Sequence, residues 1–291
     1  MSKDLDRIID VVAKKVELRL FKEMRNTPCT ATAEECGGDG LCAVRRPGDV
    51  KLIGAAGAAR VGASPGIGPV GEELASMIDH TLLKPDAAKE DLQTLCDEAR
   101  AYGFASVCVN SSNVRYCRSR LEGSGVMTVA VVGFPLGAMS IHAKAYETKQ
   151  AVRDGATEID MVINIGALKS RDYATVLEDI RAVVDAARPW PVKVILETAA
   201  LSREEKIIVC ALSKAAKAAF VKTSTGFGGG GATLDDVALM RGVVGDELGV
   251  KASGGVRDES TAHKMIEAGA TRIGASASVA IVTGKKAKSG Y

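Results

Sequence analysis

Eight short apolar runs, each separated from the next by a segment with helical spacing, constrain the fold more than any other feature of this chain. They begin after residue 73 and lie at Met77–Leu82, Ala105–Asn110, Met127–Phe134, Glu158–Asn164, Val192–Glu197, Ala218–Thr223, Gly249–Ala252 and Thr271–Ala275. The segments between them, such as 90–100, are rich in Ala, Glu, Lys and Arg. This alternation predicts parallel strands joined by crossover helices. Eight such units favour a closed (β/α)8 TIM barrel, with an open doubly wound sheet as the alternative.

The part of the chain before the barrel has a different composition, so we divide the sequence into three regions. Residues 1–25 have the spacing of an amphipathic helix, residues 26–73 form a cysteine-containing patch and a linker, and residues 74–291 form the barrel. Seven glycines and three prolines lie between Pro47 and Gly71, which is typical of a flexible spacer.

One stretch of this linker, residues 50–63, resembles a strand that runs into a dinucleotide-binding glycine loop. Such a loop needs a helix behind it, whereas Pro65 and Pro69 follow here almost at once. We therefore interpret the stretch as part of the spacer and expect no dinucleotide cofactor.

Composition narrows the class of protein. The chain has 291 residues, of which 46% are hydrophobic and 25% charged, as in soluble globular proteins. Its net charge of +2 gives no indication of nucleic-acid or membrane binding. The N-terminus lacks the apolar core of a signal peptide. The longest apolar run, near Val126–Met139, is interrupted by glycine and proline, so we expect no membrane-spanning helix there. Seven scattered cysteines fit a reducing compartment, so we expect a cytoplasmic protein.

Two lysines and one carboxylate stand out among the strands. Lys222 ends the sixth predicted strand, Lys251 lies in the seventh, and Asp160 lies in the fourth. Alternation along a strand puts Phe220 on the same face as Lys222, and Glu158 on the same face as Asp160. Catalytic groups of such barrels sit at the C-terminal ends of the strands. If these faces point inward, the three side chains share one cavity.

A buried lysine can form a structural ion pair with a carboxylate, or it can be a nucleophile. Two neighbouring ammonium groups in apolar surroundings each disfavour the charged form of the other, which lowers the pKa. A lysine with a lowered pKa attacks carbonyl groups and forms Schiff bases, and Asp160 is placed to move protons. The spacing does not decide which of the two lysines is the nucleophile.

Small residues follow the last three predicted strands and indicate a phosphate site. Loops after the seventh and eighth strands of these barrels bind phosphate through backbone N–H groups and helix N-termini. The candidate ligands are Gly226, Gly254, Gly255, Gly274 and Ser276.

The barrel sequence shows no metal-ligand spacing, because its three histidines, His80, His142 and His263, are far apart. His80 either lines the pocket or is a structural residue with a hydrogen bond. In the N-terminal part, three cysteines (Cys29, Cys36 and Cys42) lie within 14 residues and could ligate zinc or an iron–sulfur cluster, although their spacing matches no strong signature. Cys108 is interpreted as a small apolar filler that faces the pocket.

Motifs along almost the whole barrel region resemble those of the deoxyribose-phosphate aldolase family. They are IDHTLLKPDA, VCVNSSNV, VVGFPLGA, EIDMVINIGALKSRDY, VKVILETAAL, FVKTSTGFGGGGAT, VKASGGVRD and RIGAS, in this order. The resemblance implies a (β/α)8 class I aldolase of deoxyribonucleotide catabolism. Such an enzyme cleaves the phosphosugar 2-deoxy-D-ribose 5-phosphate to D-glyceraldehyde 3-phosphate and acetaldehyde, without metal or cofactor.

The resemblance also implies roles for individual residues. Lys222 becomes the Schiff-base lysine, Lys251 the second lysine that perturbs it, and Asp160 the proton-transfer carboxylate. Some family members have a lysine directly after KTSTG where this chain has Phe227, so backbone groups must bind more of the phosphate. Lys193, at the start of the fifth strand, is expected at the opposite end of the barrel with a structural role.

Other barrel chemistry remains as an alternative, namely a phosphate-binding isomerase or a transaldolase-like enzyme. A binding module without activity is disfavoured, because Lys222, Lys251 and Asp160 are all present.

The two ends of the chain carry further predictions. Tyr291, the last residue, follows a polar tail, and some family members end in a similar tyrosine; it either assists proton transfer at the mouth of the barrel or has no role. Residues 1–25 resemble encapsulation peptides, which direct enzymes into bacterial microcompartments by binding shell proteins. The apolar face of this segment consists of Leu5, Ile8, Ile9, Val12, Val16 and Leu20. Self-association is the alternative, and we expect a homo-oligomer.

Overall fold

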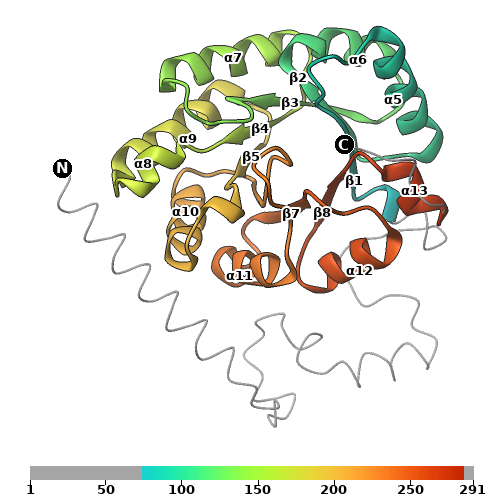
Figure 1. Cartoon of the computed structure of the whole chain (residues 1–291). Coiled ribbons are helices and arrows are strands. Elements are labelled where there is room, and N and C mark those ends of the chain that lie inside the picture. The colour runs from blue at the N-terminus through green and yellow to red at the C-terminus, as the bar shows by residue number, and fades with distance from the viewer. Residues whose placement is uncertain (1–73, 285–291) are drawn as a thin grey trace, which may run out of the picture. The chain divides into compact units, whose positions relative to one another are not determined.

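The computed structural model describes residues 74–284, which include the whole barrel (Figure 1). The predictions for residues 1–25, for the linker and cysteine patch, and for Tyr291 concern residues outside this described part.

The strands pair in parallel in the order of the sequence and close into a barrel, because β1 pairs with both β2 and β8. They are β1 (Ile78–Leu82), β2 (Ser106–Asn110), β3 (Met127–Val132), β4 (Glu158–Val162), β5 (Val192–Ile195), β6 (Phe220–Lys222), β7 (Gly249–Ser253) and β8 (Arg272–Ala275). Closure confirms the predicted (β/α)8 barrel and excludes the open doubly wound sheet. Each strand lies within two residues of its predicted limits.

Helices surround the strands as an outer ring (Figure 1). They are α5 (Lys89–Tyr102), α6 (Val114–Arg120), α7 (Ile141–Arg153), α8 (Ile165–Lys169), α9 (Tyr173–Ala187), α10 (Arg203–Ala215), α11 (Leu234–Val244), α12 (Glu259–Glu267) and α13 (Ser278–Thr283). In the described part of the chain, none of them is long and apolar enough to cross a membrane.

Local sequence determines where these helices begin and end. At the start of α10, the Ser202 hydroxyl accepts the N–H of Glu205, and the Glu205 carboxylate accepts the N–H of Ser202, which forms a capping box. Helix α5 ends at Gly103, whose φ of 66° is the left-handed conformation that glycine adopts without strain.

Alternation along the strands separates an apolar layer from a charged interior. Ile159, Val221 and Val250 are buried on the side that faces the helices, as the alternation predicts. Their neighbours Asp160 and Lys251 are fully buried and form ion pairs with residues of other strands, which places their side chains inside the barrel. The interior therefore contains buried charged groups that are paired with one another.

Candidate active site

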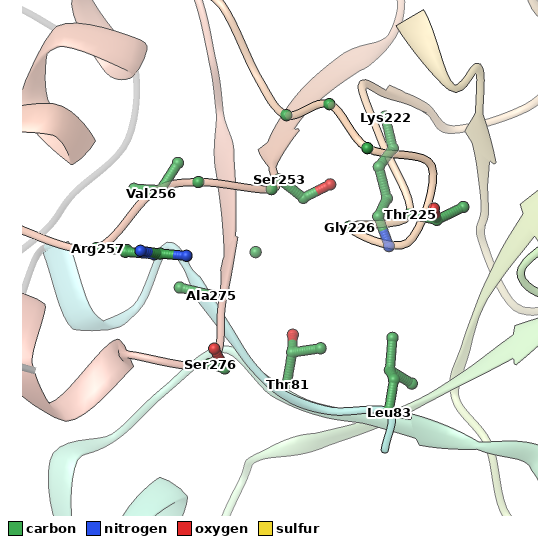
Figure 2. Close-up of a pocket in the computed structure, with 16 residues that line it drawn as sticks. Thr81, Leu83, Lys222, Thr225, Gly226, Ser253, Val256, Arg257, Ala275 and Ser276 are labelled. Atoms are coloured by element: carbon green, nitrogen blue, oxygen red, sulfur yellow. The ribbon is translucent and has the colours of Figure 1, made fainter. Parts of the chain in front are cut away.

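A cavity of about 390 Å³ opens at the C-terminal ends of the strands (Figure 2). Figure 2 shows the amine of Lys222 pointing into it, with Arg257, Ala275 and Ser276 on the other side. The lining residues are Thr81, Leu83, Lys222, Thr225, Gly226, Gly229, Gly230, Gly231, Ser253, Gly254, Gly255, Val256, Arg257, Gly274, Ala275 and Ser276. The structure thus brings Lys222 and all five residues predicted to bind phosphate to one cavity.

One carboxylate connects the two lysines singled out in the sequence. Lys222 and Lys251 are direct neighbours across the β6–β7 pairing. Each Nζ lies 2.8 Å from the same oxygen of Asp160, Oδ2. Lys222 is 2% exposed, and the other two side chains are fully buried. The three groups are in contact inside the barrel, but of the three only Lys222 is among the residues that line the cavity.

Lys193 was expected at the opposite end of the barrel, and this expectation was wrong. Its Nζ lies 2.9 Å from Oδ1 of Asp160 and also contacts the carboxylate of Glu158. The position of a residue in a strand fixes only its backbone. The four-carbon side chain of Lys193 carries its amine farther along the barrel interior, to Asp160. The carboxylate of Asp160 therefore contacts both Lys193 and Lys222.

Asp79 and Arg272 complete the interior charges. The Lys251 Nζ lies 2.5 Å from Oδ2 of Asp79, and Oδ1 of Asp79 accepts from Nη1 of Arg272 at 2.8 Å. The same Nη1 lies 3.3 Å from Oε2 of Glu158. Sequence analysis did not single out either residue, although both could have been found. Asp79 lies on the same face of its strand as Thr81 and Leu83, and Arg272 is the first residue of the RIGAS motif.

The lysines of the site differ in their tendency to carry a charge. Burial lowers the pKa of Lys222, and the ammonium of Lys251 acts in the same direction, against the carboxylate of Asp160. Burial also disfavours the charge of Lys251, but Asp160 and Asp79 outweigh it and raise the pKa of Lys251. Burial would raise the pKa of Asp160, yet Lys193, Lys222 and Lys251 hold it well below its usual range. Lys222 is therefore the amine that is most easily deprotonated.

Close backbone contact explains the glycines after β6 and β7. A Cβ on Gly231 would lie 2.5 Å from the carbonyl oxygen of Gly254, and a Cβ on Gly254 would lie 2.9 Å from Cα of Gly231. The N–H of Ala232 donates to that same Gly254 oxygen at 2.9 Å. The two loops pack main chain against main chain, an approach that only glycine permits.

Glu197 anchors the start of the first of these loops and was missed by sequence analysis. Its carboxylate accepts the hydroxyl and, at 3.2 Å, the N–H of Thr225. The Thr225 hydroxyl in turn accepts the N–H of Phe227 at 3.0 Å. Glu197 has a φ of 57°, an uncommon conformation for a residue other than glycine.

The remaining candidates lie around the site rather than in it. His80 points away from the barrel interior, and its Nε2 lies 2.7 Å from Oε2 of Glu98 on α5, which supports the structural interpretation. Cys108 packs with Leu83, and burial raises the pKa of its thiol to about 11, as expected for an apolar filler. Phe227 makes an edge-to-face contact with Phe134. Among the described residues, no group of three potential ligands is arranged to hold a metal ion.

The fold and the site together define a (β/α)8 barrel with a buried lysine–carboxylate centre that opens into a glycine-lined cavity. The chain belongs to the DeoC/LacD aldolase family, whose model matches residues 74–287. This membership confirms the family predicted from the sequence motifs.

Named relatives agree with this family. The chain is 60% identical over 221 residues to deoxyribose-phosphate aldolase 1 of Bacillus licheniformis, which covers 76% of this chain and 99% of the relative. It is 60% identical over 214 residues to the deoxyribose-phosphate aldolase of Alkaliphilus oremlandii, covering 73% and 96%. The tetrameric deoxyribose phosphate aldolase structure from Aeropyrum pernix is similar with a TM-score of 0.70 at 30% identity, covering 87% of this chain and 97% of that chain.

Proposed function

We propose that this chain is a class I aldolase that reversibly cleaves 2-deoxy-D-ribose 5-phosphate to D-glyceraldehyde 3-phosphate and acetaldehyde. The observation that carries the proposal is the amine of Lys222, which is buried, lies 2.8 Å from Asp160, and opens into the cavity lined by the glycine loops. Relatives that are 60% identical and named for this activity support the substrate.

The chemistry begins at the aldehyde carbon of the open-chain sugar. The neutral amine of Lys222 attacks C1, and loss of water gives a protonated Schiff base. A base removes the proton of the C3 hydroxyl, the C2–C3 bond breaks, and its electron pair forms an enamine at C2. Glyceraldehyde 3-phosphate leaves. The enamine then takes a proton at C2, and hydrolysis releases acetaldehyde. Asp160, in contact with Lys222, is the proposed carrier of protons.

We assign the phosphate group to the glycine-rich wall of the cavity. Gly226, Gly254, Gly255, Gly274 and Ser276 line it, and their backbone N–H groups are the proposed ligands, while Arg257 is the guanidinium among the lining residues. We assign these residues to phosphate binding. Arg257 provides a positive charge in a site where Phe227 occupies the position of the lysine found in some family members.

The packing of the two glycine loops leads to a prediction about Gly231→Ala. The new Cβ would meet the Gly254 carbonyl oxygen at 2.5 Å, so the loops must move apart. We expect KM for deoxyribose 5-phosphate to rise roughly tenfold or more, because displaced N–H groups no longer meet the phosphate. Steady-state kinetics with 2-deoxyribose, which lacks the phosphate, should show little change. Gly166→Ala is the matched control, since its Cβ makes only ordinary contact. Equal losses with both sugars would contradict the assignment.

Two measurements distinguish this function from that of an isomerase or another phosphate-binding barrel. Incubation with deoxyribose 5-phosphate should release acetaldehyde and glyceraldehyde 3-phosphate in equal amounts. Borohydride should inactivate the protein irreversibly when acetaldehyde is present, because reduction fixes the Schiff base, and should do so far less when acetaldehyde is absent. An isomerase would release no acetaldehyde and would keep its activity after reduction.

We further propose that the protein is a homo-oligomer and that residues 1–25 direct it into a bacterial microcompartment. The tetrameric relative supports an oligomer. The family match begins at residue 74, and the relative from Bacillus licheniformis is covered to 99% without needing the rest of this chain. The extension is therefore additional to the barrel. A shell would retain acetaldehyde, which is volatile and reactive.

Targeting can be tested with residues 1–25 fused to a fluorescent protein and expressed together with microcompartment shell proteins. We expect the fusion to co-purify with shells, and we expect Ile9→Asp with Val12→Asp to abolish this, because both residues lie on the apolar face. Lys14→Asp, off that face, is the control. Diffuse fluorescence that never accompanies shells would reject targeting, and dimerisation of the fusion would favour self-association.

A further inference from the structure

The barrel interior contains more ionisable groups than a lysine nucleophile and its proton carrier need. Three carboxylates (Asp79, Glu158 and Asp160) face four basic groups (Lys193, Lys222, Lys251 and Arg272). All are buried except Arg272, whose side chain is 13% exposed. The groups form one connected set, because Lys193 contacts all three carboxylates and each of the other basic groups contacts at least one of them.

The set contains one more basic group than it has carboxylates. If all seven groups were ionised, the interior would carry a net charge of +1. If Lys222 is neutral, the three carboxylates balance Lys193, Lys251 and Arg272. An uncompensated charge is costly away from water, so the balanced arrangement is the more stable one. Lys222 is the group to lose its proton, because it alone among the lysines opens into the cavity and contacts a single carboxylate.

We propose that Glu158, Lys193 and Arg272 are positioning residues that set the protonation state of Lys222 through the charge balance of the barrel interior: Lys193 and Arg272 favour its neutral, nucleophilic form, and Glu158 limits their effect. This inference rests on the proposed function, in which Lys222 is the nucleophile. None of the three residues lines the cavity. They act through the carboxylates, and Lys193 holds Oδ1 of Asp160 while Lys222 and Lys251 share Oδ2.

The remaining strands, β2 and β3, add no charged side chain to the barrel interior in the described part of the chain. Strand β2 contributes the hydroxyl of Ser106, which donates to Asp79, and the thiol of Cys108, whose raised pKa keeps it neutral. Strand β3 contributes the apolar Val129 and Val131. The charged groups that the strands bring toward Lys222 are therefore Asp79 on β1, Glu158 and Asp160 on β4, Lys193 on β5, Lys251 on β7 and Arg272 on β8. Arg257, in the loop after β7, faces Lys222 across the cavity, but its side chain is exposed to solvent, which screens its charge (Figure 2).

The charge balance makes opposite predictions for two single variants. Lys193→Met leaves three carboxylates against two cations, Lys251 and Arg272. A proton on Lys222 then restores neutrality, so the pKa of Lys222 should rise by about one to three units. Glu158→Gln leaves two carboxylates against three cations, so the pKa of Lys222 should fall. The double variant with both changes is balanced again, and its pKa should return close to that of the wild type.

The measurement follows Lys222 without relying on turnover. Acetylacetone condenses with a neutral amine to an enaminone and releases water, and mass spectrometry of the peptide that contains Lys222 gives the rate at each pH. The midpoint of the rate–pH curve reports the pKa. Lys144→Met is the matched control, because Lys144 is equally buried but pairs with Asp179 between helices α7 and α9. Its midpoint should equal that of the wild type.

Midpoints that move in opposite directions in the single variants and return in the double variant would support the proposal. Midpoints that stay unchanged, or a double variant that does not return, would overturn it. If Lys193→Met fails to fold, Arg272→Met removes the same charge from a partly exposed side chain and should raise the midpoint as well. Acetaldehyde with borohydride, applied to the wild type, tests the proposed function separately. Without modification of Lys222 that function fails, whereas modification with unmoved midpoints overturns only the charge balance.

Discussion

Replacement of Lys222 by alanine is expected to reduce kcat for deoxyribose 5-phosphate cleavage on the order of 10⁴-fold or more, because no covalent intermediate can form. The cavity and the glycine loops remain, so substrate binding should change much less than turnover. Steady-state assays with purified protein measure both. Lys214→Ala, which removes a surface lysine paired with Glu247, is the control and should keep wild-type activity.

The loss of activity must be distinguished from a loss of folded structure. Asp160 keeps its contacts with Lys193 and Lys251 when Lys222 is absent, so its carboxylate remains paired and the barrel should stay folded. Circular dichroism of Lys222→Ala should therefore match the wild type. A folded Lys222→Ala protein that retains more than a small fraction of wild-type turnover would contradict the assignment of the nucleophile.

Lys251→Leu should lower activity at neutral pH and move the remaining activity to higher pH. In the wild type, burial and the ammonium of Lys251 both lower the pKa of Lys222, so the amine is available at a lower pH than for an ordinary lysine. Without Lys251 the pKa of Lys222 rises, and each unit of increase reduces the neutral amine at pH 7 about tenfold. We expect kcat/KM at pH 7 to fall roughly 10²-fold, as for a rise of about two units.

The pH profile of kcat/KM measures this effect. Lys251→Arg preserves the positive charge next to Asp79 and Asp160, so its profile should stay close to that of the wild type even if its rate falls. A Lys251→Leu profile that is scaled down without moving along the pH axis would show that the two amines do not interact.

The sequence contained most of the fold and the centre of the site. Alternation of strand and helix patterns predicted all eight strands, and the register of β6 and β7 placed Lys222 beside Lys251 as expected. Most predicted runs extended one or two residues past an end of the strand, because apolar residues continue past the point where the backbone leaves the sheet. After β3, for example, Gly133 already has a φ of 62° and begins the loop.

The parts that could not be predicted depend on where long side chains end. The position of Lys193 in its strand indicated the wrong end of the barrel, since its amine lies several bonds away from its Cα and reaches Asp160. Glu197 gave no signal, because its contact with Thr225 depends on a left-handed backbone after β5 that its residue type does not predict. The charge balance of the barrel interior also could not be predicted, because it depends on which charged side chains contact one another across the strands.

The most direct test of the central claim is to locate the trapped intermediate. The full-length protein is incubated with acetaldehyde, reduced with borohydride and digested, and its peptides are sequenced by mass spectrometry. We predict one added ethyl group per chain, on Nζ of Lys222, because reduction converts the Schiff base of acetaldehyde into an ethyl amine. Lys251→Arg should still be modified at Lys222, and Lys222→Ala should not be modified in the barrel. An ethyl group on Lys251, or no modification of Lys222 in an active protein, would contradict this mechanism.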